Sequence, residues 1–498
     1  MLIKFYSLLD KKFKFFLFIL TILIFIGMLV ETIGITLIIP LVSLLIFEGE
    51  YINFFSKSLG VDLSSYEKRY LINIFVLLFA IFFFLKSVYL ISILYLQNKF
   101  SFELQASISY NLYRNYLSKS FLFHTNQNSS VLLRNIVIEM NNLHLFIINP
   151  LITILAEILL VLGLMSLMIF VDATVFGLII ITGIPFLFIY LSFAEKKIKI
   201  FGDKRLFFDG LKVKNVKETF NSIKEIKIYN AENYSLNYYD TVNRKSANFA
   251  KLQSWFEQFP RILLELFSAG CLLVFLLYVG SNYYDIEGLI AKTSLFALAS
   301  FKMLPSLNRI LVSLQNFKYG IPFLEKVSDD LDIANKINKT NSVDNFNNQI
   351  NKIEFKNVSF KYTDNLVLRK VNFSFQKGDI IGIKGASGSG KTTLINLIVG
   401  LLPPSEGKIV FNNEHLQKNN KPIFNVGYVP QNIFLNDDSI LRNIAFGIEN
   451  NNINLEKIDK LIQSLQLSSL IKNFKNNNNF SIGENATKIS GGEKQKIG

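Results

Sequence analysis

Gly385-Ala386-Ser387-Gly388-Ser389-Gly390-Lys391-Thr392 is the stretch that decides the fold of the C-terminal part of this chain. It fits the pattern G-x-x-x-x-G-K-[S/T], in which glycines let successive backbone N–H groups curl around a phosphate. In this pattern the lysine brings a positive charge to the β and γ oxygens of a nucleoside triphosphate, and the hydroxyl residue after it can ligate Mg²⁺. The stretch therefore predicts a nucleoside triphosphate site, formed by these eight residues and by Thr393 after them.

The residues on both sides of this loop predict an α/β domain of the P-loop type. Residues 379–383 predict a buried strand before the loop, and residues 393–399, beginning at Thr393, predict a helix after it. The N-terminus of that helix would add its dipole to phosphate binding. A Gly-rich turn without a ligand is the alternative, but a strand and a helix in these places favour the nucleotide site.

A second motif, Ser490-Gly491-Gly492-Glu493, opens the stretch SGGEKQKIG near the end of the chain. The segments GASGSGKTT, VGYVPQN, DDSILRNIAFG and KISGGEKQKIG follow one another in the order found in the nucleotide-binding domain of ABC transporters. This part of the chain resembles that domain. The resemblance implies that Tyr362, at the end of SFKY, stacks on the adenine of ATP. It also implies that Gln431 is a catalytic residue that contacts Mg²⁺ and the attacking water.

The resemblance assigns the second motif to the ATP of the opposite subunit, whose γ-phosphate Ser490, Gly491 and Gly492 would bind. Small residues at a helix N-terminus offer N–H donors to an anion, which agrees with this role. Two departures are visible, because Ile489 and Glu493 stand where the family usually has Leu and Gln. Glu493 is kept with the other three residues as a candidate contact.

The family continues beyond this motif with a strand that ends in Asp-Glu and then with a strand that ends in His. These residues serve Mg²⁺, the attacking water and the γ-phosphate, and the sequence stops at Gly498 before them. We therefore expect an incomplete nucleotide-binding domain that binds ATP but hydrolyses it poorly as given. A non-hydrolysing partner subunit is the alternative.

The N-terminal two thirds of the chain has the composition of a membrane protein. Of the 498 residues of the whole chain, 50% are hydrophobic and 48 are Phe, and the mean hydropathy is positive. Stretches long enough to cross about 30 Å of hydrocarbon predict membrane-spanning helices. The predicted spans lie near 15–46, 70–97, 146–170, 173–194, 259–281 and 288–315. The first has no small-residue cleavage site, so we interpret it as an anchor and not as a signal peptide.

The basic residues predict the orientation of the chain in the membrane. Segment 195–252 is rich in Lys and Arg, whereas 171–172 and 282–287 contain neither. By the positive-inside rule, the cytoplasm holds the N-terminus, 98–145, 195–258 and everything after 316. The net charge of +14 fits this orientation. Because the charge is spread along loops that flank spans, we expect no nucleic-acid partner.

Six spans, two long inner extensions, a linker and one cassette resemble an ABC exporter half-transporter, which must dimerise. The fold class expected is therefore an α-helical membrane domain followed by an α/β P-loop nucleotide-binding domain. We place the membrane domain at 1–325, a polar linker at 326–350 and the incomplete nucleotide-binding domain at 351–498. In that family a short helix at the tip of each inner extension docks on the cassettes, and these helices are expected near 121–130 and 221–232.

Cations inside the predicted spans are the candidate substrate residues, since intramembrane charges are costly and seldom without a role. One polar stripe on the sixth span consists of Lys302, Ser306, Arg309 and Ser313. Lys86 in the second span and Arg261 in the fifth add two more cations. The four cations, namely Lys86, Arg261, Lys302 and Arg309, could line a cavity that attracts a phosphate or pyrophosphate. Alternatively they pair with intramembrane acids, of which Glu31, Glu157 and Glu265 are available.

A closer resemblance favours the cavity. ETIGITLIIPLVSLL, FPRILLELF and LASFKMLPSLNRI are similar to flippases of lipid-linked oligosaccharides in bacterial protein N-glycosylation. In that family basic cavity residues attract the pyrophosphate of an undecaprenyl-linked glycan, and Lys86, Arg261 and Arg309 fall at matching positions, with Lys at 86 where Arg is familiar. The family also has a short amphipathic helix in its first outer loop, which 51–59 could form; an ordinary interfacial loop is the alternative.

We therefore expect a homodimeric ABC exporter of the bacterial inner membrane that uses ATP and Mg²⁺ to flip a lipid-linked, pyrophosphate-bearing oligosaccharide. Thr392 and Gln431 are the expected Mg²⁺ contacts. The partners expected are a second copy of the chain, membrane lipid and the glycolipid substrate. A lipid A, multidrug or peptide exporter is the alternative, and cations that are all paired with acids would favour it.

Overall fold

A computed structural model of the chain describes residues 2–37, 68–171, 173–282, 286–337, 351–362, 365–412, 414–415, 426–468, 470, 482–483 and 486–498. The chain divides into two compact units, Met1–Ser342 and Val343–Gly498, and each unit is described by itself. The first holds the apolar N-terminal part of the sequence, and the second holds both phosphate motifs.

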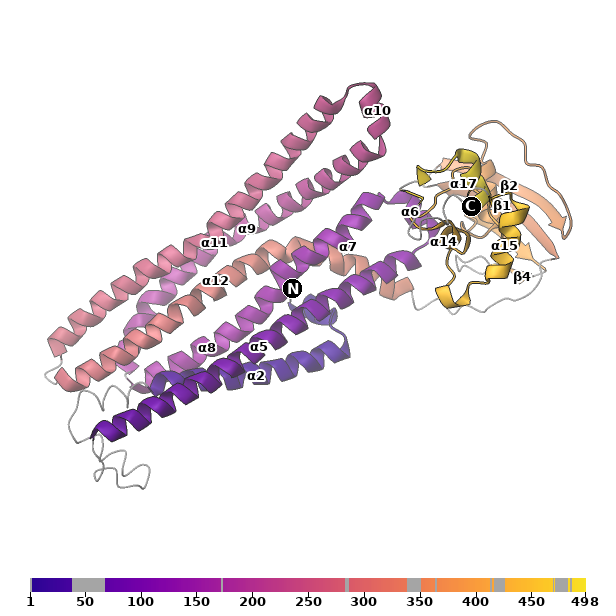
Figure 1. The fold of residues 1–498 in the computed structure, drawn as a ribbon. Helices are drawn as coiled ribbons and strands as arrows, with labels where there is room; N and C mark the ends of the chain where they lie inside the picture. Colours follow the sequence, from indigo (N-terminus) through magenta and orange to yellow (C-terminus); the bar gives the residue numbers. More distant parts are fainter. Residues whose placement is uncertain are drawn as a thin grey trace. The chain divides into compact units, whose positions relative to one another are not determined.

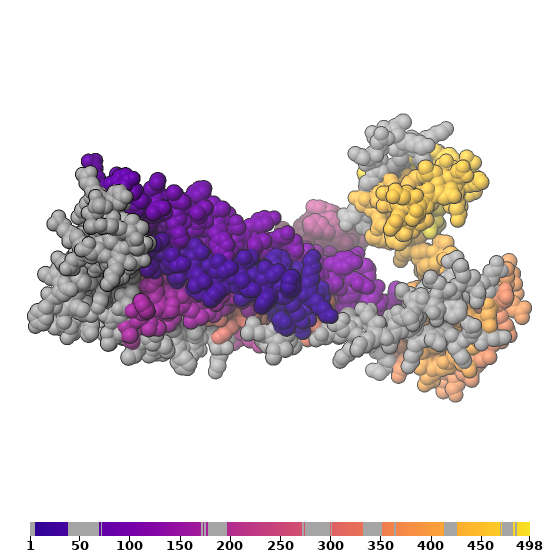
Figure 2. Space-filling view, turned by 90° about the horizontal axis from the view of Figure 1, so that it is seen from below, coloured from indigo at the N-terminus to yellow at the C-terminus, as the bar shows by residue number. Residues whose placement is uncertain are grey.

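The first unit is helical throughout its described residues, as its long apolar runs predict. Two of its helices, α9 and α11, run side by side over their length, and the short α10 lies at their tip (Figure 1). Helices α2 and α5 also lie side by side and cover one face of the unit (Figure 2). The helices are α1 (Leu2–Ser7), α2 (Lys11–Thr36), α5 (Lys68–Ser118), α6 (Phe121–Asn126), α7 (Ser129–Leu143), the π-helical η1 (His144–Ile148), α8 (Asn149–Val171), α9 (Ala173–Asn221), α10 (Ile223–Ile228), α11 (Glu232–Asn282) and α12 (Ile286–Ile337).

The predicted spans fall on these long helices wherever the structure describes them. Three helical stretches among the described residues are long and apolar enough to cross a membrane, namely Lys11–Thr36, Ile72–Ser118 and Ser129–Phe170. The end of the first predicted span, 38–46, and the predicted amphipathic helix at 51–59 lie outside the described residues. The other predicted spans lie within α9, α11 and α12.

Short helices are present at both expected tips of the inner extensions. Helix α6 follows α5, and the Ser120 side chain caps it by accepting a hydrogen bond from the Phe123 N–H. Helix α10 separates α9 from α11, as the pattern near 221–232 predicts. Docking of either helix on a cassette stays a prediction.

The core of the first unit is apolar and its helices approach closely. Leu20, Phe100, Leu143 and Leu324 bring α2, α5, α7 and α12 into one buried cluster. Glycines permit the tightest crossings: a Cβ built on Gly202 of α9 would lie 2.4 Å from the Tyr319 carbonyl oxygen of α12. The membrane domain was predicted to end at 325 with a polar linker after it. Helix α12 continues through this point to Ile337, and its Val327 is fully buried in the same cluster. The bounds of the membrane domain and the linker stay a prediction.

The second unit contains an antiparallel sheet in the order β2-β1-β3-β4. Phe355 of β1 lies opposite Phe373 of β2, and their rings stack 4.4 Å apart. A small helical part follows the sheet along the chain. The elements are β1 (Lys352–Tyr362), β2 (Asn365–Gln376), α13 (Lys391–Ile398), β3 (Glu406–Phe411), β4 (Glu414–His415), α14 (Ile440–Ile444), the 3₁₀ turn η3 (Asn450–Asn452), α15 (Leu455–Ser464) and α17 (Gly491–Ile497).

The prediction for the two sides of the P-loop is half confirmed. Helix α13 follows the loop as predicted, but residues 379–383 form no strand, and Ile380 and Ile381 are exposed. A buried strand exists only where neighbouring strands satisfy its backbone on both edges. None of the four strands in the described sheet pairs with this stretch. Its apolar sequence alone therefore does not produce the strand.

Candidate functional site

The P-loop is shaped by glycines in a conformation that other residues avoid. Gly388 and Gly390 have φ of +79° and +87°, in the left-handed region. A Cβ built on Gly388 would meet no heavy atom within 4 Å, so the loop has open space on that side. At the other end, a Cβ on Gly385 would lie 2.7 Å from the Ser389 Oγ. The glycines thus allow a tight loop with room beside it for a ligand.

Lys391 is held over this loop. It is the first residue of α13, and its Nζ donates hydrogen bonds to the carbonyl oxygens of Gly385 (2.9 Å) and Ala386 (2.8 Å). Thr392 is exposed, whereas Thr393 is buried. An exposed hydroxyl and an ammonium beside an open loop fit the triphosphate of ATP with Mg²⁺. The role of Thr393 in binding ATP stays a prediction.

Tyr362 lies at the same end of the sheet as the P-loop. It is the last residue of β1, where it pairs with Asn365 of β2, and its ring meets Phe360 edge-on at 4.8 Å. A Cβ on Gly390 would lie 3.0 Å from both Val367 and Leu368, which follow Asn365 two and three residues later on β2. The last glycine of the loop therefore packs against the hairpin end that carries Tyr362. This placement fits an aromatic platform for adenine.

The second motif starts a helix, as predicted. Ser490 is the N-cap of α17, and Ser490 and Glu493 form a reciprocal capping box in which the Ser490 N–H donates to the Glu493 carboxylate (2.7 Å). Hydrogen bonds from the Ser490 hydroxyl and then from its backbone N–H lower the pKa of Glu493. Gly491 and Gly492 are exposed, with no atom within 4 Å of a Cβ built on either. Glu493 thus has a structural role at the start of α17, which a Gln could also fill.

Gln431 is exposed. Ile433, two residues later, packs on the buried cluster that contains Ile489, just before the Ser490 cap, and Ile497, the last residue of α17. The described members of this cluster come from the helical part of the unit, and none is a P-loop residue. The chain after Gln431 therefore packs on the core that carries α17, and a contact of Gln431 itself with Mg²⁺ stays a prediction.

Each of the four candidate cations of the first unit has an acidic partner. Lys86 of α5 and Lys302 of α12 both pair with Glu31 of α2, and the Lys86 Nζ lies 2.8 Å from the carboxylate. Arg309 of α12 pairs with Glu157 of α8, with a second hydrogen bond of 3.2 Å from its Nη2. Arg261 pairs with Glu265 one turn later on α11 at 3.0 Å, where both side chains are largely exposed. Of the two alternatives for these residues, the structure shows the ion pairs.

The residues of the predicted polar stripe lie on α12, and two of the four are buried. Ser306 and Ser313 are buried, whereas Lys302 and Arg309 keep about half of their side chains accessible. Arg309 also donates to the Ser306 hydroxyl at 3.3 Å. The accessible faces of the two cations leave room for a ligand beside their pairs.

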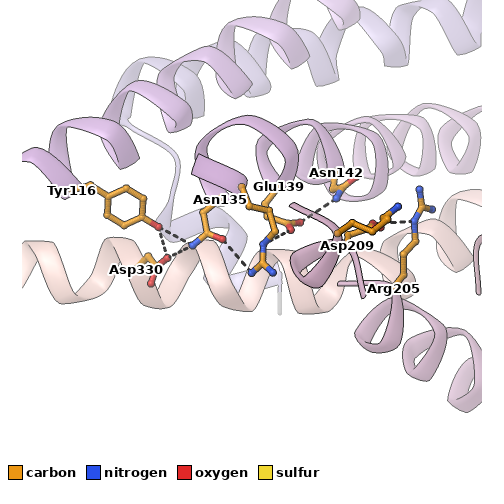
Figure 3. A network of polar contacts seen from close by, with 9 residues as sticks. Tyr116, Asn135, Glu139, Asn142, Arg205, Asp209 and Asp330 are labelled. Atoms are coloured by element: carbon orange, nitrogen blue, oxygen red, sulfur yellow. Dashed lines mark hydrogen bonds and ion pairs between the residues drawn. The ribbon is translucent and has the colours of Figure 1, made fainter. Parts of the chain in front are cut away.

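A buried polar network joins the helices of the first unit and was not foreseen from the sequence (Figure 3). Asp330 of α12 accepts hydrogen bonds from the Tyr116 hydroxyl of α5 (2.5 Å) and the Asn135 amide of α7 (3.0 Å). Glu139 of α7 is fully buried and pairs with Arg134 at 3.2 Å. The contact of Asp330 with Tyr116 joins residues 214 positions apart, which no local pattern contains. The signal available in the sequence was Arg134 and Glu139, a base and an acid on one short helix.

A second part of this network connects α9 with α12. Arg205 donates to the Tyr319 hydroxyl at 3.1 Å and pairs with Asp209 one turn later at 3.5 Å. Burial raises the pKa of Tyr319 to about 12, so its hydroxyl remains a neutral acceptor for the guanidinium at neutral pH. The Asp209 carboxylate also accepts from Ser246 of α11. The network thus fixes α9, α11 and α12 relative to one another.

Comparison with known proteins bears on both units. The family model described as ABC transporter matches residues 368–498. A putative export ATP-binding/permease protein of Rickettsia typhi is 26% identical over 387 residues, which cover 72% of this chain and 62% of that protein. This chain thus spans less than two thirds of the length of that relative. An ATP-dependent lipid A-core flippase of Wigglesworthia glossinidia brevipalpis is 26% identical over 402 residues, which cover 78% of this chain and 67% of that protein.

Two further similarities concern a transport protein and a solved structure. The lactococcin-G-processing and transport ATP-binding protein of Lactococcus lactis subsp. lactis is 30% identical over 291 residues, covering 56% of this chain and 40% of that protein. A solved structure of a bacterial Atm1-family ABC exporter with ATP bound superposes with a TM-score of 0.74. It covers 98% of this chain and 83% of that one at 17% identity, so it shows the likeness of the fold alone.

Proposed function

Because the chain is an ABC exporter half-transporter, a multi-pass protein of the inner membrane with a cytoplasmic ABC transporter domain, we propose that it binds ATP with Mg²⁺ and exports an amphipathic lipid. The observation that carries the nucleotide part is the P-loop, in which Lys391 lies over a glycine loop with open space beside it. When bound, ATP supplies the free energy of its hydrolysis. Thr392 and Gln431 are the residues proposed to hold Mg²⁺.

The proposed exporter is a homodimer. Ser490 caps α17, whose Ile497 belongs to the small helical core, whereas Gly390 of the P-loop packs on β2 of the sheet. Two copies in opposite orientation would give each nucleotide Lys391 from one subunit and Ser490 from the other. Such an arrangement makes ATP favour the closed dimer, since only that state offers both sets of contacts. The short helices α6 and α10 are proposed to transmit closure to the membrane domain.

A direct binding measurement tests the nucleotide part. Lys391→Ala in the purified full-length chain is expected to weaken binding of a fluorescent ATP analogue with Mg²⁺ by about 100-fold, because a charged group that contacts phosphate contributes roughly 2–3 kcal/mol. Lys384→Ala is the matched control, since it removes an exposed lysine just outside the loop. Equal affinity of Lys391→Ala and the unchanged chain would contradict an ATP site at this loop.

For the substrate we propose a lipid-linked oligosaccharide that bears a pyrophosphate. Support comes from the accessible sides of Lys302 and Arg309, which lie in one stripe on α12 at the depth of the membrane. Guanidinium and ammonium groups are suited to phosphate oxygens. Arg261, with most of its side chain exposed, is proposed to contribute at the cytoplasmic end of the same path.

The paired state of the cations favours a second candidate substrate, a lipid A-type or other amphiphile whose head group is not held by these residues. Ion pairs with Glu31, Glu157 and Glu265 reduce the charge available to a ligand. The relative from Wigglesworthia is named for lipid A-core, and the one from Lactococcus for lactococcin G. Both candidates share the exporter mechanism and differ only in what the membrane cavity recognises.

A transport assay separates the two candidates. In proteoliposomes, Arg309→Ala is expected to lower ATP-dependent flipping of a pyrophosphate-linked lipid about tenfold, because it removes one charged contact. Flipping of a fluorescent lipid without phosphate should not change. Arg244→Ala is the matched control, because Arg244 forms an exposed pair with Asp240 outside the predicted spans. Pyrophosphate-lipid flipping that survives Arg309→Ala would favour the second candidate.

A further inference from the structure

Glu31 is the most buried charged group at the depth of the membrane among the described ion pairs. Its side chain is 2% exposed, although it lies in α2, within the first predicted span. Its two carboxylate oxygens face two cations, Lys86 from α5 and Lys302 from α12. One acid therefore joins three helices, and we refer to Glu31, Lys86 and Lys302 as the triad.

The triad contains two basic side chains and only one acidic side chain. Two ammonium groups share a single carboxylate, whereas Arg309 with Glu157 and Arg261 with Glu265 are one-to-one pairs. The four candidate cations and their three acids thus leave a single net charge, and it resides in the triad. An uncompensated charge in a membrane domain is costly unless it faces water or an anionic ligand.

The two lysines of the triad have different surroundings. The Lys86 side chain is 10% exposed, and its Nζ lies 4.6 Å from the centre of the Phe83 ring. A Cβ built on Gly34 would lie 3.1 Å from the same Nζ. Lys302 is 44% exposed. A ligand can therefore approach Lys302, whereas Lys86 acts through the charge that it gives to Glu31.

We propose that Glu31 is a specificity-determining residue of the transport site, which positions Lys302 and leaves the triad with one positive charge for an anionic lipid head group. This rests on the proposed export of a lipid. The carboxylate lies against the two ammonium groups, and a phosphate on the substrate competes with it for Lys302. Since Lys86 also offsets Glu31, the triad keeps one positive charge that attracts a phosphate to Lys302. Without Lys86 the carboxylate would neutralise Lys302.

The charge count predicts how three substitutions affect ligand binding. The probe is farnesyl pyrophosphate, with farnesol as the uncharged comparison, bound to the purified full-length chain in detergent. Glu31→Gln raises the triad to two positive charges and is expected to tighten farnesyl pyrophosphate binding about tenfold, with a steeper dependence on salt. Farnesol binding should stay the same. Glu103→Gln is the control, because Glu103 forms an exposed pair with Lys99 outside the predicted span.

The two lysines provide the sharper comparison. Lys302→Gln removes the accessible cation, and Lys86→Gln removes the buried one, but each leaves a neutral triad. Both are expected to weaken farnesyl pyrophosphate binding by about tenfold. A simple contact role would instead make Lys302 important and the buried Lys86 nearly neutral. This comparison also decides the question if Glu31→Gln fails to fold, as judged by size-exclusion chromatography.

The outcomes separate this inference from the proposed function. If the unchanged chain binds farnesyl pyrophosphate no better than farnesol, the proposed pyrophosphate-bearing substrate is wrong. If it prefers the pyrophosphate but Glu31→Gln leaves the affinity unchanged or lowers it, or Lys86→Gln has no effect, the role of Glu31 is overturned while the substrate proposal stands. Tighter binding by Glu31→Gln, with equal losses in the two lysine variants, supports the inference.

Discussion

Gly390 occupies a position where the chain has little choice of residue. Its φ of +87° is unfavourable for any residue with a Cβ, and the space around it is taken by Val367 and Leu368 of β2. The loop therefore owes its shape to a backbone conformation and to close packing at once. A side chain here would disturb the end of the sheet that carries Tyr362.

Replacing this glycine is expected to weaken nucleotide binding. Gly390→Ala should lower the affinity for a fluorescent ATP analogue by about tenfold, because a strained φ and a displaced loop cost roughly 1–2 kcal/mol. Gly378→Ala is the matched control, since Gly378 has a φ of +96° but open space around its Cβ position. It should destabilise the unit without changing affinity. Equal affinities for both variants would contradict the importance of the loop geometry.

Glu257 provides a pH-dependent prediction at the same scale. Burial raises the pKa of this carboxyl, which accepts a hydrogen bond from Gln253 at 2.8 Å. A raised pKa means that the folded chain binds a proton more tightly than the unfolded chain does. Stability therefore falls as the pH rises above the ordinary value of 4.5, and the loss is complete above the raised pKa.

Removing this charge should relieve that loss. Glu257→Gln is expected to raise the midpoint of thermal unfolding in detergent by about 2 °C at pH 8. The two midpoints should converge well below pH 4.5, where Glu257 is protonated in both the folded and the unfolded chain. A difference at pH 8 that persists unchanged at that low pH would show that the charge of Glu257 has no part in it.

At the scale of elements, the C-terminal half of α12 is fixed to two other helices by Asp330. The carboxylate accepts hydrogen bonds from Tyr116 of α5 and Asn135 of α7 (Figure 3). The backbone carbonyl of Asp330 accepts a further one from Asn115. Asn135 is almost fully buried, so its amide has little access to water in place of this acceptor. The helix end that precedes the second unit along the chain is therefore held by specific hydrogen bonds as well as by apolar packing.

Asp330→Ala is expected to destabilise the first unit by about 2–3 kcal/mol, because two buried donors lose their acceptor. Thermal unfolding of the purified chain would measure this loss. Asp240→Ala removes a carboxylate from an exposed helix pair with Arg244 and should change stability by less than about 0.5 kcal/mol. Similar losses in the two variants would contradict a structural role for the buried network.

The sequence correctly predicted most of the described helices. It did not predict the buried polar network, and it predicted a strand at 379–383 that the structure does not contain. Long apolar stretches identify α5 and α8 without knowledge of their neighbours, since length and hydropathy are local properties. Residues 379–383 are equally apolar, yet a strand depends on partners that a local pattern does not contain. The contact of Asp330 with Tyr116 likewise joins residues 214 positions apart. The sequence singled out the four cations of the site, and the structure was needed to show which acid each one meets.

At the scale of the whole molecule, the two phosphate motifs belong to different parts of the second unit. The P-loop packs on the β1–β2 hairpin, while α17 belongs to the small helical core with Ile433 and Ile489. The motif spacing predicted both sites, and the resemblance to ABC transporters supplied the proposal that they meet across two subunits. Pairing of two copies is therefore the assembly to test.

A cross-linking experiment tests this assembly. In a chain with Cys271→Ser, the pair Ser389→Cys and Ser490→Cys is expected to form a disulfide between subunits when ATP is added, because ATP would bring the loop of one copy to the motif of the other. Gel electrophoresis without reductant would show the dimer. The pair Ser389→Cys and Ser464→Cys is the control, since Ser464 is exposed at the end of α15. Equal cross-linking with and without ATP would contradict nucleotide-dependent pairing.

Gly34 has a consequence for how this chain can vary. It stands one turn after Glu31 on α2, and the Lys86 ammonium fills the space that a side chain there would need. A larger residue at 34 would displace the ammonium, and the wider, planar guanidinium of Arg at 86 would need still more room. The two positions are therefore expected to change together during evolution: among descendants of this chain, a gain of bulk on α2 should be accompanied by a shorter or uncharged residue on α5.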